Sequence, residues 1–358
     1  MNNKKFFAAV VGLGLVTLSA CGSSSDDGTG SGSESKTVTL VSHDSWAVSK
    51  NVLADFEKKS GYKVRVLEDG DAGQAVNKAI LTKDNPQGDV LFGVDNTLLS
   101  RALDNGLFQP YEAKGADTIK AGYRVDGDKV TPVDTGDICV NYDKAYFTEH
   151  KLAPPTSYDD LVKPAYRNLL VTENASTSSP GLGFLLGTAA KYGDDGWEGY
   201  WKKLKANGVK VVDGWEQAYN EEFSGSAGGK KAKADRPLVV SYASSPPAEV
   251  IYADPKPKTA PTGVVDGTCF RQTEYAGLLS NAENSKGGKA FLDFLLTKEF
   301  QQDMPLNMFV YPVVEGAQVP AEFTQYGPQA KDPETMDPAK IADHRDDWVK
   351  SWTSLVLK

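Results

Sequence analysis

The chain has 358 residues, of which 40% are hydrophobic and 24% are charged, and its formal net charge is −9. This length is sufficient for two domains, and the hydrophobic content is that of an ordinary globular core. The acidic balance argues against a nucleic-acid partner and against a polybasic membrane-binding patch.

Residues 1–20 have the features of a cleaved signal peptide, because two lysines precede an apolar stretch that is too short to span a bilayer. The segment ends in Leu18-Ser19-Ala20-Cys21, which matches a lipoprotein cleavage box in which Cys21 receives the lipid. The Gly/Ser/Asp-rich residues 21–36 are typical of a flexible tether. We therefore predict an extracytoplasmic lipoprotein anchored to the outer face of the cell membrane through Cys21.

Strands and helices are predicted to alternate after the tether, with strands at 36–42, 62–67 and 89–94 and helices at about 49–60 and 74–82. Polar or aromatic residues follow each strand: His43, Asp44, Ser45 and Trp46, then Asp69, then Asp95. The carboxyl ends of parallel strands are where open α/β sheets bind ligands. Each aspartate alone is also explained by capping of the next helix, but three in register favour a ligand site.

The α/β pattern continues in the second half, with strands at 138–142, 168–172, 209–212 and 238–242 and helices at about 181–192, 197–207, 286–297, 298–304 and 339–355. The Gly/Ala/Lys-rich stretch 225–235 is predicted to be a surface loop. Trp348 and Trp352 are four residues apart and are expected to pack on one face of the last helix.

The stretch Thr177-Ser178-Ser179-Pro180-Gly181 predicts a polar clamp at the start of a helix. Ser179 suits the capping position and Pro180 the first helical position, where its missing N–H costs nothing. The free N–H groups and the Thr177 and Ser178 hydroxyls would then face outward together. An ordinary capped helix explains the segment equally well when it is taken alone.

No catalytic motif stands out. The three histidines are isolated, and no spacing typical of a nucleophile, a metal site or a nucleotide-binding loop occurs. The sequence therefore predicts no enzyme, no cofactor and no metal. Aromatic, hydroxyl and carboxylate side chains recur at strand ends instead, a mixture suited to a flat, cationic small molecule.

Seven motifs stand in the order seen in thiamine-binding proteins of ABC importers, and the resemblance covers essentially the whole chain after the signal. They are Leu67-Glu68-Asp69-Gly70, Gly93-Val94-Asp95-Asn96, Ser179-Pro180-Gly181-Leu182-Gly183, Gly214-Trp215-Glu216-Gln217-Ala218-Tyr219, Ser241-Tyr242, Ser245-Pro246 and Tyr311-Pro312-Val313. The resemblance implies a monomeric receptor that captures thiamine, with thiamine phosphates as further candidate ligands, and delivers it to a membrane permease.

The implied fold class is α/β: a two-lobed periplasmic-binding-protein fold of type II with two hinge crossovers, each lobe a mixed sheet flanked by helices. Lobe 1 is expected over 37–134 and 268–320, lobe 2 over 135–267 and a C-terminal helical segment over 321–358. Cys139 lies in the first expected crossover and Cys269 just after the second. Outside the cytoplasm two such cysteines favour a disulfide, and we predict that they pair.

The resemblance also assigns ligand contacts. Asp69 and Ser178 match residues that hold the aminopyrimidine end of thiamine, and Trp215 and Tyr242 match aromatic contacts. The complete expected ligand set is His43, Asp44, Ser45, Trp46, Asp69, Asp95, Ser178, Ser179, Trp215, Tyr219, Tyr242, Ser245, Phe309 and Tyr311.

Three positions depart from the pattern of this family: His43 replaces a tyrosine, Phe309 replaces a tryptophan, and Ala248 replaces the tyrosine that stacks on the thiazolium ring. Tyr252, one helical turn on, is the candidate substitute for the missing ring. These departures leave a polyamine receptor of the same fold as the alternative. A ferric-iron receptor is a further one, although the chain has no adjacent pair of tyrosines.

Overall fold

The computed structural model describes residues 35–125, 127–327 and 329–358. The predicted signal peptide, the lipidation site Cys21 and nearly all of the tether lie outside the described residues. Within the described ranges, none of the helices combines the length and the apolar character that a membrane span requires.

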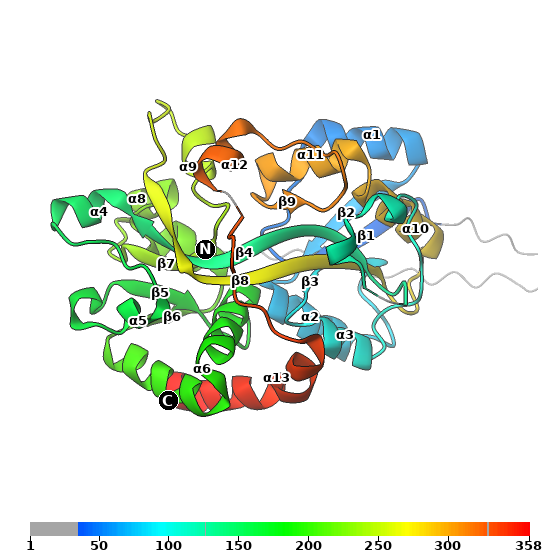
Figure 1. Cartoon of the computed structure of the whole chain (residues 1–358). Coiled ribbons are helices and arrows are strands. Elements are labelled where there is room, and N and C mark those ends of the chain that lie inside the picture. Colours follow the sequence, from blue (N-terminus) through cyan, green and yellow to red (C-terminus); the bar gives the residue numbers. More distant parts are fainter. Residues whose placement is uncertain (1–34, 126, 328) are drawn as a thin grey trace, which may run out of the picture. The chain divides into compact units, whose positions relative to one another are not determined.

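One nine-stranded sheet runs through the described chain in the order β2-β1-β3-β8-β4-β7-β5-β6, with β9 paired to β4 (Figure 1). Strand β1 is parallel to β2 and β3, and β5 is parallel to β6 and β7, whereas β8 and β4 run antiparallel to their neighbours. The strands are β1 (Thr37–Ser42), β2 (Lys63–Glu68), β3 (Val90–Asp95), β4 (Thr131–Asp143), β5 (Leu170–Glu173), β6 (Lys210–Val212), β7 (Leu238–Tyr242), β8 (Thr262–Leu278) and β9 (Tyr311–Pro312).

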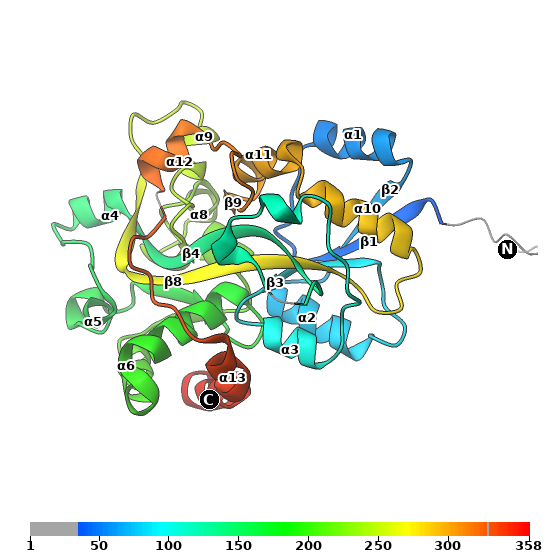
Figure 2. The ribbon, with the colours of Figure 1, turned by 45° about the vertical axis from the view of Figure 1, so that its right-hand side comes forward.

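Helices cover both faces of this sheet. They are α1 (Lys50–Ser60), α2 (Ala72–Leu81), α3 (Leu99–Asp104), α4 (Lys144–Glu149), α5 (Tyr158–Leu161), α6 (Ser179–Ala206), α7 (Trp215–Gln217), α8 (Ala227–Ala232), α9 (Ala248–Ile251), α10 (Ser285–Leu295), α11 (Lys298–Asn307), α12 (Ala321–Tyr326) and α13 (Pro338–Trp352). Around strands β1 to β3, helices α1, α10 and α11 lie on one side and α2 and α3 on the other (Figures 1 and 2).

The α/β fold class predicted from the sequence is confirmed, because two groups of parallel strands are joined through the long antiparallel strands β4 and β8. We call the strands β1 to β3 and their helices lobe 1, and β5 to β7 and their helices lobe 2. The lobes do not have separate sheets, because the thirteen-residue β4 and the seventeen-residue β8 extend from one lobe into the other. The residue boundaries expected for the lobes stay a prediction.

The two crossover strands are joined covalently where they lie side by side. Ile138 of β4 pairs with Phe270 of β8, and next to this pair Cys139 and Cys269 form a disulfide with their Cα atoms 4.2 Å apart. Both cysteines are buried in a small cluster with Ala243. The disulfide therefore lies at the passage between the lobes, where the sequence placed the hinge.

Helix α13 packs against helices of both lobes. The fully buried Trp352 packs edge-on against Trp201 of α6, with ring centroids 5.5 Å apart. Asp346 accepts from Arg101 of α3 at 3.2 Å. Figures 1 and 2 both show α13 beside α6. The prediction that Trp348 and Trp352 are packing residues is confirmed, because both side chains are buried.

Two local expectations are wrong. The stretch 225–235 contains the short helix α8 rather than only a loop, because Ser226 caps it by accepting from the Gly229 N–H at 2.8 Å and alanine and lysine are good helix formers. Helix α6 begins at Ser179, so Ser178 occupies the capping position. The prediction of two successive helices in this stretch is confirmed, because Gly193, with φ 68° and ψ 177°, is not helical and divides α6 into two helical parts.

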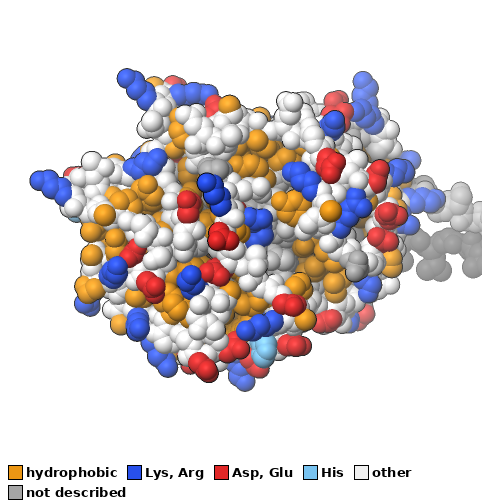
Figure 3. Space-filling model, viewed as in Figure 1, with side chains coloured by type: hydrophobic (Ala, Val, Ile, Leu, Met, Phe, Trp, Pro, Cys, Tyr) orange, Lys and Arg blue, Asp and Glu red, His pale blue; other side chains and the backbone are white. Residues whose placement is uncertain are grey.

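Charged side chains of both signs are scattered over the face shown in Figure 3, with hydrophobic side chains between them. That face shows no block of one sign.

Candidate ligand-binding site

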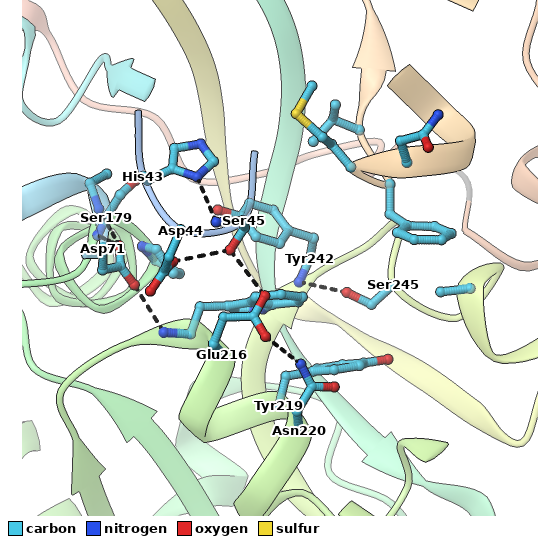
Figure 4. Close-up of a pocket in the computed structure, with 18 of the residues that line it drawn as sticks. His43, Asp44, Ser45, Asp71, Ser179, Glu216, Tyr219, Asn220, Tyr242 and Ser245 are labelled. Atoms are coloured by element: carbon cyan, nitrogen blue, oxygen red, sulfur yellow. Dashed lines mark hydrogen bonds between the residues drawn. The ribbon is translucent and has the colours of Figure 1, made fainter. Parts of the chain in front are cut away.

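A cavity of about 330 Å³ lies where the two lobes meet (Figure 4). Lobe 1 contributes the turn after β1 and the start of α2, and lobe 2 contributes the start of α6, the α7 turn, the end of β7 and α9. Residues 307–310, which follow α11, form a further wall. The cavity therefore forms at the carboxyl ends of strands from both lobes, where the sequence predicted a ligand site.

The cavity brings together most of the predicted ligand residues. Those that line it are His43, Asp44, Ser45, Ser179, Trp215, Tyr219, Tyr242, Ser245 and Phe309. They come from segments that are as much as 266 residues apart in the chain, between His43 and Phe309, so only the folded sheet places them together.

Trp46 and Tyr311 do not line the cavity. Trp46 packs in the core of lobe 1, with its ring 4.8 Å from Phe92 and 5.7 Å from Phe300 between centroids. The Tyr311 hydroxyl donates to the backbone oxygen of Phe323 at 3.2 Å. Both aromatic rings therefore serve packing in this structure.

The predicted aspartates Asp69 and Asp95 and the predicted Ser178 also lie outside the lining. Asp69 forms an ion pair with Lys78. Asp95 lies one layer behind the cavity, where it accepts from the Ser179 hydroxyl and, at 2.8 Å, from Gln272. Ser178 is buried at the capping position of α6. Because the Ser179 hydroxyl donates to Asp95, it points toward that carboxylate rather than toward its own helix.

Asp71 lines the cavity and was missed by the sequence reasoning. It caps α2, and its Oδ1 accepts from the N–H of Ala72 at 2.6 Å and of Ser179 at 3.2 Å. Its Oδ2 accepts from the N–H of Trp215 at 2.9 Å (Figure 4). The available signal was a capping box, since Gln74 follows Asp71 by three residues and reaches back to its N–H.

Carboxylates dominate the charge of the cavity. Its acidic lining residues are Asp44, Asp71, Glu216, Glu249 and Glu274, of which the last three were also missed. Among the described residues that line it there is no lysine or arginine. Burial raises the pKa of Asp71, Glu216 and Glu249, because a charged carboxylate loses hydration there. A bound cation would restore part of that lost stabilisation.

His43 is the one basic side chain among the described lining residues, and its charge is balanced internally. Its Nε2 lies 3.4 Å from Glu274 Oε1. Burial would lower the pKa of His43, but the hydrogen bond and charge of Glu274 raise it overall. Burial would raise the pKa of Glu274, but His43 lowers it, while burial and Glu274 raise the pKa of the neighbouring Asp134. His43 and Glu274 therefore stabilise each other's charged forms.

Aromatic rings form two walls of the cavity. Trp215 stacks on Tyr219 with centroids 5.1 Å apart and planes 16° apart, and its Nε1–H donates to Ser241 Oγ at 2.9 Å. Across the cavity, Tyr252 and Phe309 meet edge to face at 5.7 Å. Ala248 and Tyr252 both line this side of the cavity, and the small side chain of Ala248 leaves space there.

Several hydrogen bonds join the two lobes around the cavity. Asp71 of lobe 1 accepts from Ser179 and Trp215 of lobe 2, and the Ser45 hydroxyl donates to Glu216 at 3.3 Å. The Tyr252 hydroxyl donates to the backbone oxygen of Leu306 in α11. The described structure is therefore one in which the lobes are drawn together over the site.

Comparisons with known proteins agree with this architecture. A family model described as "Bacterial extracellular solute-binding protein" matches residues 85–244. The thiamine-binding periplasmic protein of Escherichia coli K12 is 29% identical over 90% of this chain and 94% of its own, and that of Brucella suis is 27% identical over 88% and 91%. A solved structure titled "Periplasmic thiamin binding protein" superposes with a TM-score of 0.77 at 27% identity, covering 89% of this chain and 96% of that one.

Proposed function

We propose that this protein is the receptor that captures thiamine for an ABC importer. The proposal rests on its homology with the thiamine-binding periplasmic proteins and on the solute-binding fold that it shares with them. The homologues are binding proteins rather than enzymes. In the proposal, thiamine enters between the lobes, the lobes close over it, and the closed receptor delivers it to the permease.

The main support for this proposal is that stacked aromatic rings and carboxylates line one cavity. Thiamine contains two flat rings, one of which is a cation. The Trp215–Tyr219 stack offers a ring face to such a cation, and Glu216 and Asp44 supply negative charge beside it. We propose that Tyr252 and Phe309 enclose the ligand from the opposite side. Their rings would then do the work of the tyrosine that other family members carry at the position of Ala248.

A polyamine or ferric-iron receptor of the same fold is the alternative. A polyamine would use the same carboxylates but has no ring to stack. No group of three histidine, cysteine, aspartate or glutamate side chains in the described ranges is arranged to hold a metal ion. The stacked pair of rings favours a flat heteroaromatic ligand, and this is why thiamine is the first proposal.

The test is calorimetry on ligand-stripped protein with thiamine, spermidine, putrescine and ferric citrate. We expect saturable binding of thiamine at one site and no comparable heat from the others. Native mass spectrometry of protein purified without added ligand checks which molecule copurifies. Binding of a polyamine, with no heat or fluorescence change on adding thiamine, would overturn the proposal.

Lipid anchoring is part of the proposed function. We propose that Cys21 is diacylated after signal cleavage and that the Gly/Ser/Asp-rich tether holds the receptor near its permease. We expect the Cys21→Ala variant to leave the membrane fraction and appear in the soluble one, because it has no thiol to carry the lipid. Fractionation without detergent, followed by immunoblotting, measures this. If the variant stayed fully membrane-bound, the proposed anchor would be wrong.

A further inference from the structure

We propose that this receptor selects unphosphorylated thiamine over its phosphate esters, and that Asp71 sets this selection by occupying the place where a phosphate would find its donors. The inference rests on the proposed function and narrows its ligand class. It is carried by the hydrogen bonds of Asp71 and by the charge of the cavity wall.

The start of α6 is the place in the cavity where an anion would be expected to bind. The first N–H groups of a long helix have no partner within the helix, and the helix dipole adds partial positive charge there. Here the N–H of Ser179 already donates to Asp71 at 3.2 Å. The N–H of Trp215, on the facing turn, donates to the other carboxylate oxygen at 2.9 Å.

Asp71 thus binds two donors from lobe 2 with a side chain from lobe 1. It is held in place because it also caps α2 through the N–H of Ala72, and only 7% of its surface is exposed. A phosphate that approached these donors would have to displace a buried, hydrogen-bonded carboxylate. The protein therefore supplies its own anion at this position.

The other described residues that line the cavity include no lysine or arginine to bind a phosphate. A phosphate monoester carries about −1.5 to −2 charges at pH 7. The cavity presents Asp44, Glu216 and Glu249 to it. The charge of His43 is already matched by Glu274, 3.4 Å away. A phosphate held inside this cavity of about 330 Å³ would therefore be repelled by like charges.

The cation itself faces no such penalty. The carboxylates that repel a phosphate attract the thiazolium ring, so the same residues favour one ligand and disfavour the other. Selectivity of this kind depends on a repulsive element as well as on attractive contacts. Asp71 is the repulsive element that can be removed with least damage, since serine is also a good capping residue for α2.

The experiment is calorimetry with thiamine, thiamine monophosphate and thiamine diphosphate on the wild type, on Asp71→Ser and on Asp84→Ser. Asp84 is an exposed aspartate just beyond the other end of α2 and serves as the matched control. Because Asp71 also joins the lobes, the readout is the ratio of the dissociation constants for the monophosphate and for thiamine, not either constant alone.

We expect the wild type and Asp84→Ser to bind the monophosphate at least fivefold more weakly than thiamine, and Asp71→Ser to reduce that ratio at least twofold while the other carboxylates keep part of it. Equal wild-type affinities for thiamine and its monophosphate would overturn the inference, and so would an unchanged ratio in a folded Asp71→Ser variant. Absence of thiamine binding to the wild type would instead overturn the proposed function.

Discussion

Replacing Trp215 by alanine is expected to weaken thiamine binding at least tenfold, or about 1.4 kcal/mol. The Trp215 ring is only part-buried, stacks on Tyr219 at 5.1 Å and is fixed by a hydrogen bond from its Nε1 to Ser241. A ring held in one orientation loses little freedom when a ligand stacks on it, so its face is available for a cation. Calorimetry of ligand-stripped wild type and variant measures the change.

Trp215→Phe is the matched control, because it keeps a ring in the same place but loses the Nε1 donor. We expect the dissociation constant of Trp215→Phe for thiamine to lie between those of the wild type and Trp215→Ala. Thermal unfolding without ligand separates a lost contact from a damaged fold. An alanine variant that is folded and binds thiamine within twofold of the wild type would exclude stacking on Trp215.

Replacing both Cys139 and Cys269 by alanine is expected to lower the free energy of unfolding by about 2–4 kcal/mol. The disulfide closes a long loop, since the two residues are 130 positions apart, and a cross-link over a long loop restricts the unfolded chain. Urea unfolding of both proteins gives the difference from the midpoints and slopes. Wild-type protein that has been reduced should unfold like the double variant.

The same variant shows whether ligand binding depends on the disulfide. Neither cysteine lines the cavity, so we expect thiamine to bind the double variant within threefold of the wild type while the strands β4 and β8 lose their covalent link. A fall in unfolding free energy below about 0.5 kcal/mol, with both thiols shown by mass mapping to be paired in the wild type, would contradict the loop argument.

The sequence by itself determined the local elements of this protein and its fold class. Strand alternation and helix periodicity depend on neighbouring residues, so β1 to β3, α1 and α2 lie within a few residues of their predicted positions. The crossover strands are the exception, because β4 begins at Thr131 rather than at 138 and β8 was not predicted as a strand. Strand β7 was predicted with its observed bounds, 238–242. The motifs of the thiamine-binding proteins then ordered these elements into two lobes, and the comparisons confirm that resemblance.

Tertiary structure alone decided which polar side chains face the ligand cavity. Asp69 and Asp71 are two residues apart, yet one pairs with Lys78 and the other caps α2 and meets the N–H groups of Ser179 and Trp215. Those donors lie more than 100 positions along the chain, in the other lobe, so no local pattern contains them. The direction of a side chain after a strand end depends on how the turn packs, and that packing exists only once the lobes have come together.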